Sequence, residues 1–146
     1  MFAKKTNGRV WELLENADRS SQEAEEMVQA AHTSLYHWLH AGTSVHHQRG
    51  MWMIARVQTM LGNSDEALRY ALRCLELTEE YADEMQDFDI AFAYEGAGRV
   101  YALVGDKQEA EKYIKLAEEA GGKIEDDQDR KIFEADFQGG HFFVVR

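Results

Sequence analysis

The residues best suited to chemistry are two arginines, Arg56 and Arg99, which lie 43 residues apart. An aromatic residue accompanies each one: Trp52 stands four residues before Arg56, and Phe92 stands seven residues before Arg99. At about 3.6 residues per turn, these spacings place each ring on the same helix face as its arginine. A guanidinium fork beside an aromatic ring suits a carboxylate attached to an apolar or aromatic body. The pattern therefore predicts a surface that binds an acidic group.

The same stripe of residues has a purely structural interpretation. Glu95 lies four residues before Arg99, an arrangement that forms ordinary ion pairs along a helix, each worth about 0.2–0.5 kcal/mol. Arginine stems often do no more than cover apolar surface, and Trp52 would belong to the core if its helix were slightly rotated. Both interpretations stay open at this point. The residues of the predicted groove are Arg49, Trp52, Arg56, Phe92, Glu95 and Arg99.

Five of the six histidines fall between His32 and His47, which raises the hypothesis of a metal site. His37 and His40 share one side of a predicted helix, and His47 follows across the turn at Gly42. These three side chains could meet, but no acidic or cysteine partner stands at the spacing of a zinc motif such as His-Glu-x-x-His. Solvated or capping histidines are the favoured interpretation, and a site built from the His32–His47 cluster is the alternative.

No nucleophile in the sequence has a recognisable base beside it. Cys74 occupies a position where the repeat favours small residues, so we expect it in the core. Gly96 and Gly98 lie inside a predicted helix with no strand before them, so close helix contact explains them better than a phosphate-binding loop. The sequence therefore predicts no catalytic residue, no metal ligand and no cofactor, and the expected protein is not an enzyme.

A phrase that occurs three times determines where these side chains lie. Ser20, Asn63 and Asp106 each stand three residues before a glutamate, and each copy of the phrase follows the previous one by 43 residues. Side chains of these types accept hydrogen bonds from the free N–H groups of a helix's first turn, and the glutamate can reach back to the N–H of the cap. The phrase predicts three helix starts, so the chain is a helical repeat.

Helical periodicity extends over nearly the whole chain, and glycines mark several helix ends, including a left-handed stop at Gly42. We expect an all-α fold with a flexible start over residues 1–7, one helical domain over residues 8–138 and an apolar tail over residues 139–146. The seven expected helices cover residues 8–17, 20–41, 43–61, 63–83, 87–104, 106–121 and 125–137.

The composition of the chain argues against some classes of binding partner. The formal net charge of −11 argues against nucleic acid and against anionic membrane surfaces, since both attract cationic patches. The single cysteine cannot form an intrachain disulfide, the first residues lack the apolar stretch of a secretion signal, and no apolar run has the length of a membrane span. We therefore expect a soluble cytoplasmic protein.

The third copy of the repeat resembles the tetratricopeptide repeat (TPR) family. The matching small, aromatic and glycine positions are Tyr94, Ala97, Gly98, Tyr101, Gly105, Ala110, Ile114 and Ala117. The second copy matches more loosely, and the whole chain is similar to small bacterial TPR-like proteins. The period of 43 exceeds the family's usual length of about 34, and the closing proline is absent, which implies longer helices.

The resemblance implies a right-handed stack of antiparallel helix pairs, that is, an α-solenoid. In that family the first helix of each pair lines a concave groove that holds extended peptides, so the predicted stripe would lie in the groove. The expected function is a non-catalytic scaffold for a peptide or protein partner with an acidic character.

Two alternatives come from other classes of protein. One is a metal-binding protein or small metal-dependent enzyme that uses the His32–His47 cluster. The other is a self-associating structural protein, because a short stack leaves an end that needs cover. Its homodimer would form through that end or through the tail around Phe142–Val145. The tail itself either tucks over the last helix pair or forms an exposed patch that binds another chain.

Overall fold

The computed structural model describes the backbone of residues 2–139 and the side chains of residues 8–137, and this part of the chain folds into seven α-helices without a strand. The helices are α1 (Phe2–Glu15), α2 (Ser21–Ala41), α3 (Ser44–Met60), α4 (Ser64–Glu80), α5 (Asp87–Val104), α6 (Lys107–Gly121) and α7 (Asp127–Gly139), with a short 3-10 turn at Ala82–Glu84. The expectation of an all-α fold with seven helices is confirmed.

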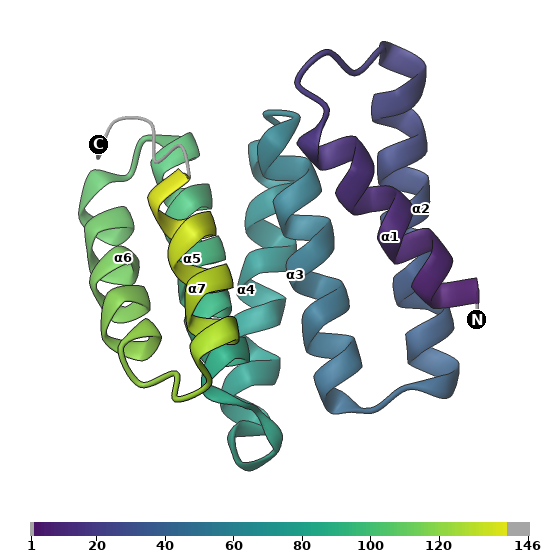
Figure 1. The fold of residues 1–146 in the computed structure, drawn as a ribbon. Coiled ribbons are helices and arrows are strands. Elements are labelled where there is room, and N and C mark those ends of the chain that lie inside the picture. Colours follow the sequence, from purple (N-terminus) through teal and green to yellow (C-terminus); the bar gives the residue numbers. More distant parts are fainter. Residues whose placement is uncertain (1, 140–146) are drawn as a thin grey trace.

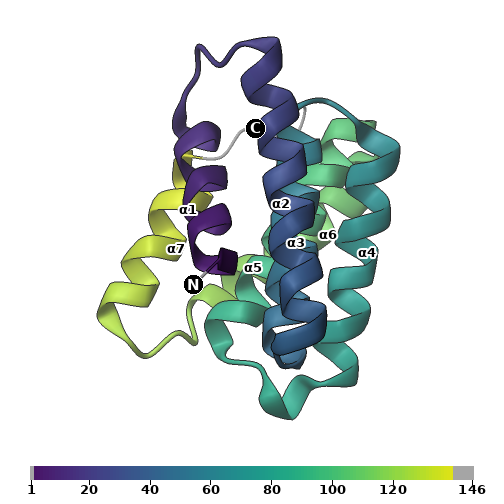
Figure 2. The same cartoon turned by 90° about the vertical axis from the view of Figure 1, so that its right-hand side faces the viewer.

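Each helix from α1 to α6 packs against the next one in the chain, and α3 also touches α5 (Figure 1). Helix α7 then returns over α5 and α6. Figure 2 shows that α1 and α7 lie on one side of α3 and α5, while α4 and α6 lie on the other side. Helices α3 and α5 are therefore covered on both sides, which explains why about half of the residues of each helix are buried.

The repeated phrase marks three helix starts, as expected, but its copies use different hydrogen bonds. The Ser20 side chain accepts from the N–H of Glu23, whose carboxylate accepts from the N–H of Ser20, so the capping box is complete. Asp106 accepts from the N–H of Glu109. Asn63 instead donates from its side-chain amide to Oε1 of Gln58, 2.7 Å away. The three helix starts remain 43 residues apart, although only the first copy makes both hydrogen bonds of a capping box.

Several expected boundaries need correction. Helix α1 begins at Phe2, six residues before the expected start at Gly8; no strong helix breaker stands before Gly8, and each added residue contributes one hydrogen bond to an existing helix. Gly42 has φ −102°, which is extended rather than left-handed. A Cβ on Gly42 would lie 2.8 Å from the carbonyl oxygen of Trp38, so the glycine is required by close approach instead.

Two further boundaries differ at the C-terminal side. The fourth helix ends at Glu80, and the 3-10 turn follows it at Ala82–Glu84. The seventh helix covers Asp127–Gly139. Its Asp126 side chain accepts from the N–H of Asp129, which sets the start two residues later than expected. Residues 140–146, which hold Phe142–Val145 of the predicted tail, lie outside the described residues.

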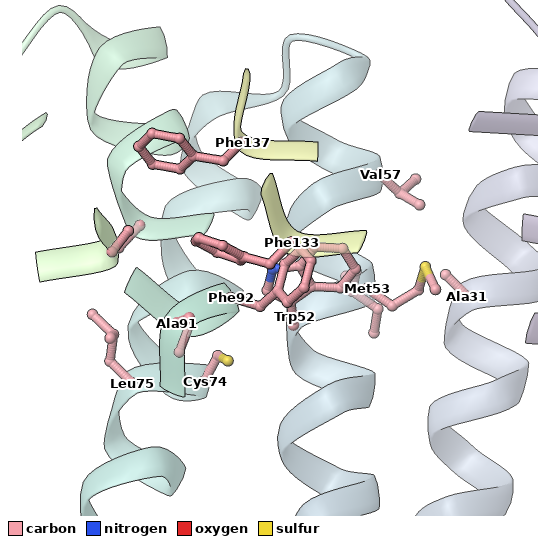
Figure 3. Close-up of a cluster of buried hydrophobic side chains, with 14 of the residues drawn as sticks. Ala31, Trp52, Met53, Val57, Cys74, Leu75, Ala91, Phe92, Phe133 and Phe137 are labelled. Carbon is pink, nitrogen blue, oxygen red and sulfur yellow. The ribbon is translucent and has the colours of Figure 1, made fainter. Parts of the chain in front are cut away.

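One large cluster of buried apolar residues includes side chains of all seven helices, α7 among them, and a smaller cluster joins α3, α4 and α5. Figure 3 shows Phe133 of α7 beside Trp52 of α3 and Phe92 of α5. Cys74 is buried, as expected, and a Cβ on Gly98 would lie 3.1 Å from the Ile114 side chain, so α5 and α6 approach closely there. Within residues 2–139, no helix combines the length and apolar character that crossing a membrane requires.

Candidate functional site

The predicted stripe lies on the face of α3 and α5 that α1 and α7 cover, and it is divided into two parts. Arg56, Glu95 and Arg99 lie beneath α7 in an ionic cluster, which Asp136 of α7 completes. Arg49 instead borders a cavity, together with the rings of Trp52 and Phe92. The structure thus brings all six predicted residues to one face. Trp52 and Phe92 are buried in the core, as the structural interpretation expects of Trp52, and of the six only Arg49 is substantially exposed.

The ionic cluster joins three helices. Arg56 donates from both terminal nitrogens to the Asp136 carboxylate, over 2.9 and 3.0 Å. Arg99 donates from Nε to Glu95 over 2.7 Å and from Nη2 to the backbone carbonyl of Asp136 over 2.8 Å. The Glu95 side chain is fully buried, and 4% of the Arg99 side chain is exposed. The ion pair between Glu95 and Arg99 that the structural interpretation required is present, within a larger network.

The two carboxyl groups of the cluster titrate in opposite directions. Burial raises the pKa of Glu95 to about 8, and the Asp136 carboxylate adds to this rise while Arg99 and Arg56 oppose it. Burial also disfavours ionisation of Asp136, but hydrogen bonds from Glu95 and Arg56 and the charges of both arginines outweigh it and lower its pKa to about 2. Oε1 of Glu95 is buried and has no hydrogen-bond partner among the described residues, whereas Oε2 accepts from Arg99.

Aromatic packing holds α7 in the same place. The Phe133 ring meets Phe92 edge to face with 5.0 Å between the ring centroids, and Phe92 meets Trp52 in the same way at 5.3 Å. Gly121 makes room for Phe133, because a Cβ there would lie 2.4 Å from the ring. Helix α7 therefore occupies this half of the face with an aromatic ring and a carboxylate.

The second half of the face is a cavity of about 350 Å³ whose wall includes all three tryptophans. Helices α1, α2, α3, α5 and α7 all contribute to its wall. The lining residues are Trp11, Ala31, Ser34, Trp38, His46, Gln48, Arg49, Gly50, Trp52, Met53, Phe88, Asp89, Phe92 and Ile132. A mostly apolar wall with few polar groups is typical of ligand sites.

The charged pair at the cavity is asymmetric in exposure. Arg49 donates from Nε to Asp89 over 2.6 Å, and 47% of the Arg49 side chain is exposed, against 1% of Asp89. The other Asp89 oxygen accepts from the backbone N–H of Gln86 and so forms part of the cap of α5. Asp89 is therefore occupied at both oxygens, and the accessible charge at the cavity is the Arg49 guanidinium.

His46 supplies a second donor on the same helix. Its ring stacks on Trp38 with 4.0 Å between centroids, and its Nδ1 accepts from the backbone N–H of Thr43. Burial lowers the pKa of His46, and the cationic Arg49 adds to this effect. The neutral ring accepts at Nδ1, so it carries its proton on Nε2.

The histidine cluster does not assemble into a metal site. His40 Nδ1 lies 2.9 Å from the carbonyl of Tyr36, and His47 Nε2 lies 2.9 Å from the carbonyl of Trp38. Over residues 8–137 no group of three histidine, cysteine or acidic side chains converges as metal ligands would. Cys74 packs against the carbonyl of Gln48, and burial raises its pKa to about 12, which makes the thiol a poor nucleophile.

No protein-family model, curated protein or solved structure matches the chain, so its own geometry carries the argument for function. Sequence reasoning missed Asp136 and the participation of Trp11, Trp38 and Asp89 in the site. One available signal was the spacing of Phe133, Asp136 and Phe137, which places two rings and one carboxylate on one face of α7.

Proposed function

We propose that this protein is a non-catalytic TPR-like scaffold that binds a peptide or protein partner on the face formed by α3 and α5. In this proposal the helix pairs form a right-handed α-solenoid, and α3 and α5 are the inner helices of two successive pairs. The starts of α3 and α5, at Ser44 and Asp87, are 43 residues apart, as the repeat requires.

The observation that carries the proposal is the aromatic cavity beside Arg49. Three tryptophans border a cavity of about 350 Å³, and of these Trp52 is buried, Trp38 is partly buried and Trp11 is exposed. Ligand sites are lined mainly by apolar and aromatic side chains. Aromatic residues and arginine are also the types enriched at the centres of protein interfaces.

The test is a selection from an unbiased library of displayed peptides against the full chain. Enriched peptides, resynthesised, should change the tryptophan fluorescence of the protein, because all three indoles border the cavity. Trp38→Ala should weaken binding at least 10-fold. Arg73→Ala, on the exposed side of α4, is the matched surface control and should leave binding unchanged. The proposal is wrong if no peptide is enriched or if the enriched peptides bind Trp38→Ala as tightly as the unaltered protein.

A further inference from the structure

The two halves of the face repeat one chemical arrangement along α3. Arg49 and Arg56 are seven residues apart, about two helical turns, so they lie on the same side of the helix. Trp52 lies between them and borders both regions, with the Arg56 guanidinium 5.8 Å from its ring centroid. Each arginine therefore lies beside the same aromatic residue, Trp52.

Helix α7 shows what the half around Arg56 binds. Its Asp136 carboxylate receives two hydrogen bonds from Arg56, and its Phe133 ring packs on Phe92. The ring and the carboxylate are three residues apart, which puts them on one face of a helix. The molecule thus contains one example of an aromatic and acidic segment seated on this surface.

The half around Arg49 offers the same groups to an external segment. The Arg49 side chain, which is 47% exposed, and Nε2–H of His46 offer donors, and these two residues lie on one side of α3, three residues apart. Asp89 is not available to bind a cationic group of a partner, because it is buried and both of its oxygens already accept hydrogen bonds. The cavity volume of about 350 Å³ is at the small end of ligand sites, so it suits one aromatic side chain with its neighbour.

We propose that the cavity binds a partner peptide that presents an aromatic side chain and a carboxylate three residues apart, as α7 presents Phe133 and Asp136. The partner's ring packs among Trp11, Trp38 and Phe88, and its carboxylate pairs with Arg49. This inference rests on the proposed function and names the kind of peptide that the site selects.

The probe is an acetylated and amidated peptide with the sequence of residues 126–137, which includes the capping Asp126 and contains no tryptophan. Titrated into the full chain, it should produce a saturable change in tryptophan fluorescence. Peptides that carry Asp136→Asn or Phe133→Ala should bind at least 10-fold more weakly. A peptide with Glu134→Gln is the matched control, since it loses the same charge at a position exposed in α7 and should bind within 2-fold.

Variants of the protein locate the site. Arg49→Gln should weaken binding of the unaltered peptide at least 10-fold, whereas Arg73→Gln should not. Circular dichroism establishes that each variant folds, and the peptide series gives the same test without any change in the protein. The inference is overturned if the peptide does not bind, or if the Asp136→Asn and Glu134→Gln peptides bind equally well.

A third result would also overturn it. If Arg56→Gln abolishes binding while Arg49→Gln does not, the peptide exchanges with α7 and does not enter the cavity. Failure of the inference is separable from failure of the proposed function: library peptides that need Trp38 but lack an acidic residue would support the scaffold and reject the acidic partner.

Discussion

The two halves of the face on α3 and α5 have similar chemistry but opposite states. Around Arg56 and Arg99 the charges are buried and paired by α7, whereas 47% of the Arg49 side chain is exposed. Breaking a buried ion pair costs several kcal/mol because one charge is left unpaired, while an exposed pair contributes little. The closed half therefore contributes to stability through buried, paired charges. In the open half, Trp38 is only partly buried and can be altered at small cost, whereas removal of Arg49 would take a partner from the buried Asp89.

The largest effect should come from the ring that holds α7 in place. Phe133→Ala removes a buried aromatic side chain from Phe92 and Gly121, so we expect the free energy of unfolding to fall by about 3 kcal/mol in urea denaturation. Ile132→Ala, on the same helix but 49% exposed, should cost below about 1 kcal/mol. Equal losses would show that α7 is not anchored through Phe133.

The next effect concerns the carboxylate of the closed half. Asp136→Asn leaves Arg56 and Arg99 with one buried acid, and a loss of about 2 kcal/mol is expected because 19% of the Asp136 side chain is exposed. Glu134→Gln removes the same charge from an exposed position of α7 and should change the free energy of unfolding by less than about 0.5 kcal/mol. A similar result for both variants would contradict the pairing seen in the ionic cluster.

A dependence on pH should distinguish the closed half as well. Folding raises the pKa of Glu95 from an ordinary value of 4.5 to about 8, so the folded state binds more protons than the unfolded state between these values. The contribution of Glu95 to stability therefore decreases as pH rises through this window, by at most about 1.4 kcal/mol per pH unit. Glu95→Gln keeps a neutral donor and should flatten the profile measured by urea denaturation. Parallel profiles for the two proteins would refute the raised pKa.

The smallest effect on stability should come from the open half. Trp38 is only partly buried and stacks on His46, so Trp38→Ala should lower the free energy of unfolding by about 1 kcal/mol or less. Thermal denaturation followed by circular dichroism measures this change. A loss as large as that of Phe133→Ala would make the cavity part of the supporting core, and the contrast between the halves would disappear.

Much of the fold could be predicted from local patterns. The cap phrase located the starts of α2, α4 and α6, and left-handed glycines close α3 and α5 at Gly62 and Gly105, because the chemistry of caps acts within a few residues. The relation between Arg56 and Arg99 followed from the spacing of 43 alone. Arg56 and Asp136, in contrast, are 80 residues apart, and no local rule specifies which face a terminal helix covers.

The burial of Glu95 shows a second limit. As a charged residue in a polar stripe, it was expected at the surface or in an ordinary helical pair, and it is fully buried. The apolar residues of α7 supply the cover, and the two arginines with Asp136 make the burial tolerable. Such compensation depends on partners from three helices, so it becomes visible only in the folded molecule.

Modification of the single thiol, Cys74, can measure how often the central helices separate. Cys74 is 1% exposed, lies against α3 and has a pKa near 12, so a thiol reagent reaches it only after α3 and α4 separate. With reagent in large excess, labelling outpaces reclosing, so the rate of modification equals the opening rate of the central helices and does not depend on local release of α7. In the Asp136→Asn protein, an unchanged labelling rate would show that the terminal helix can leave while the centre of the repeat stays closed.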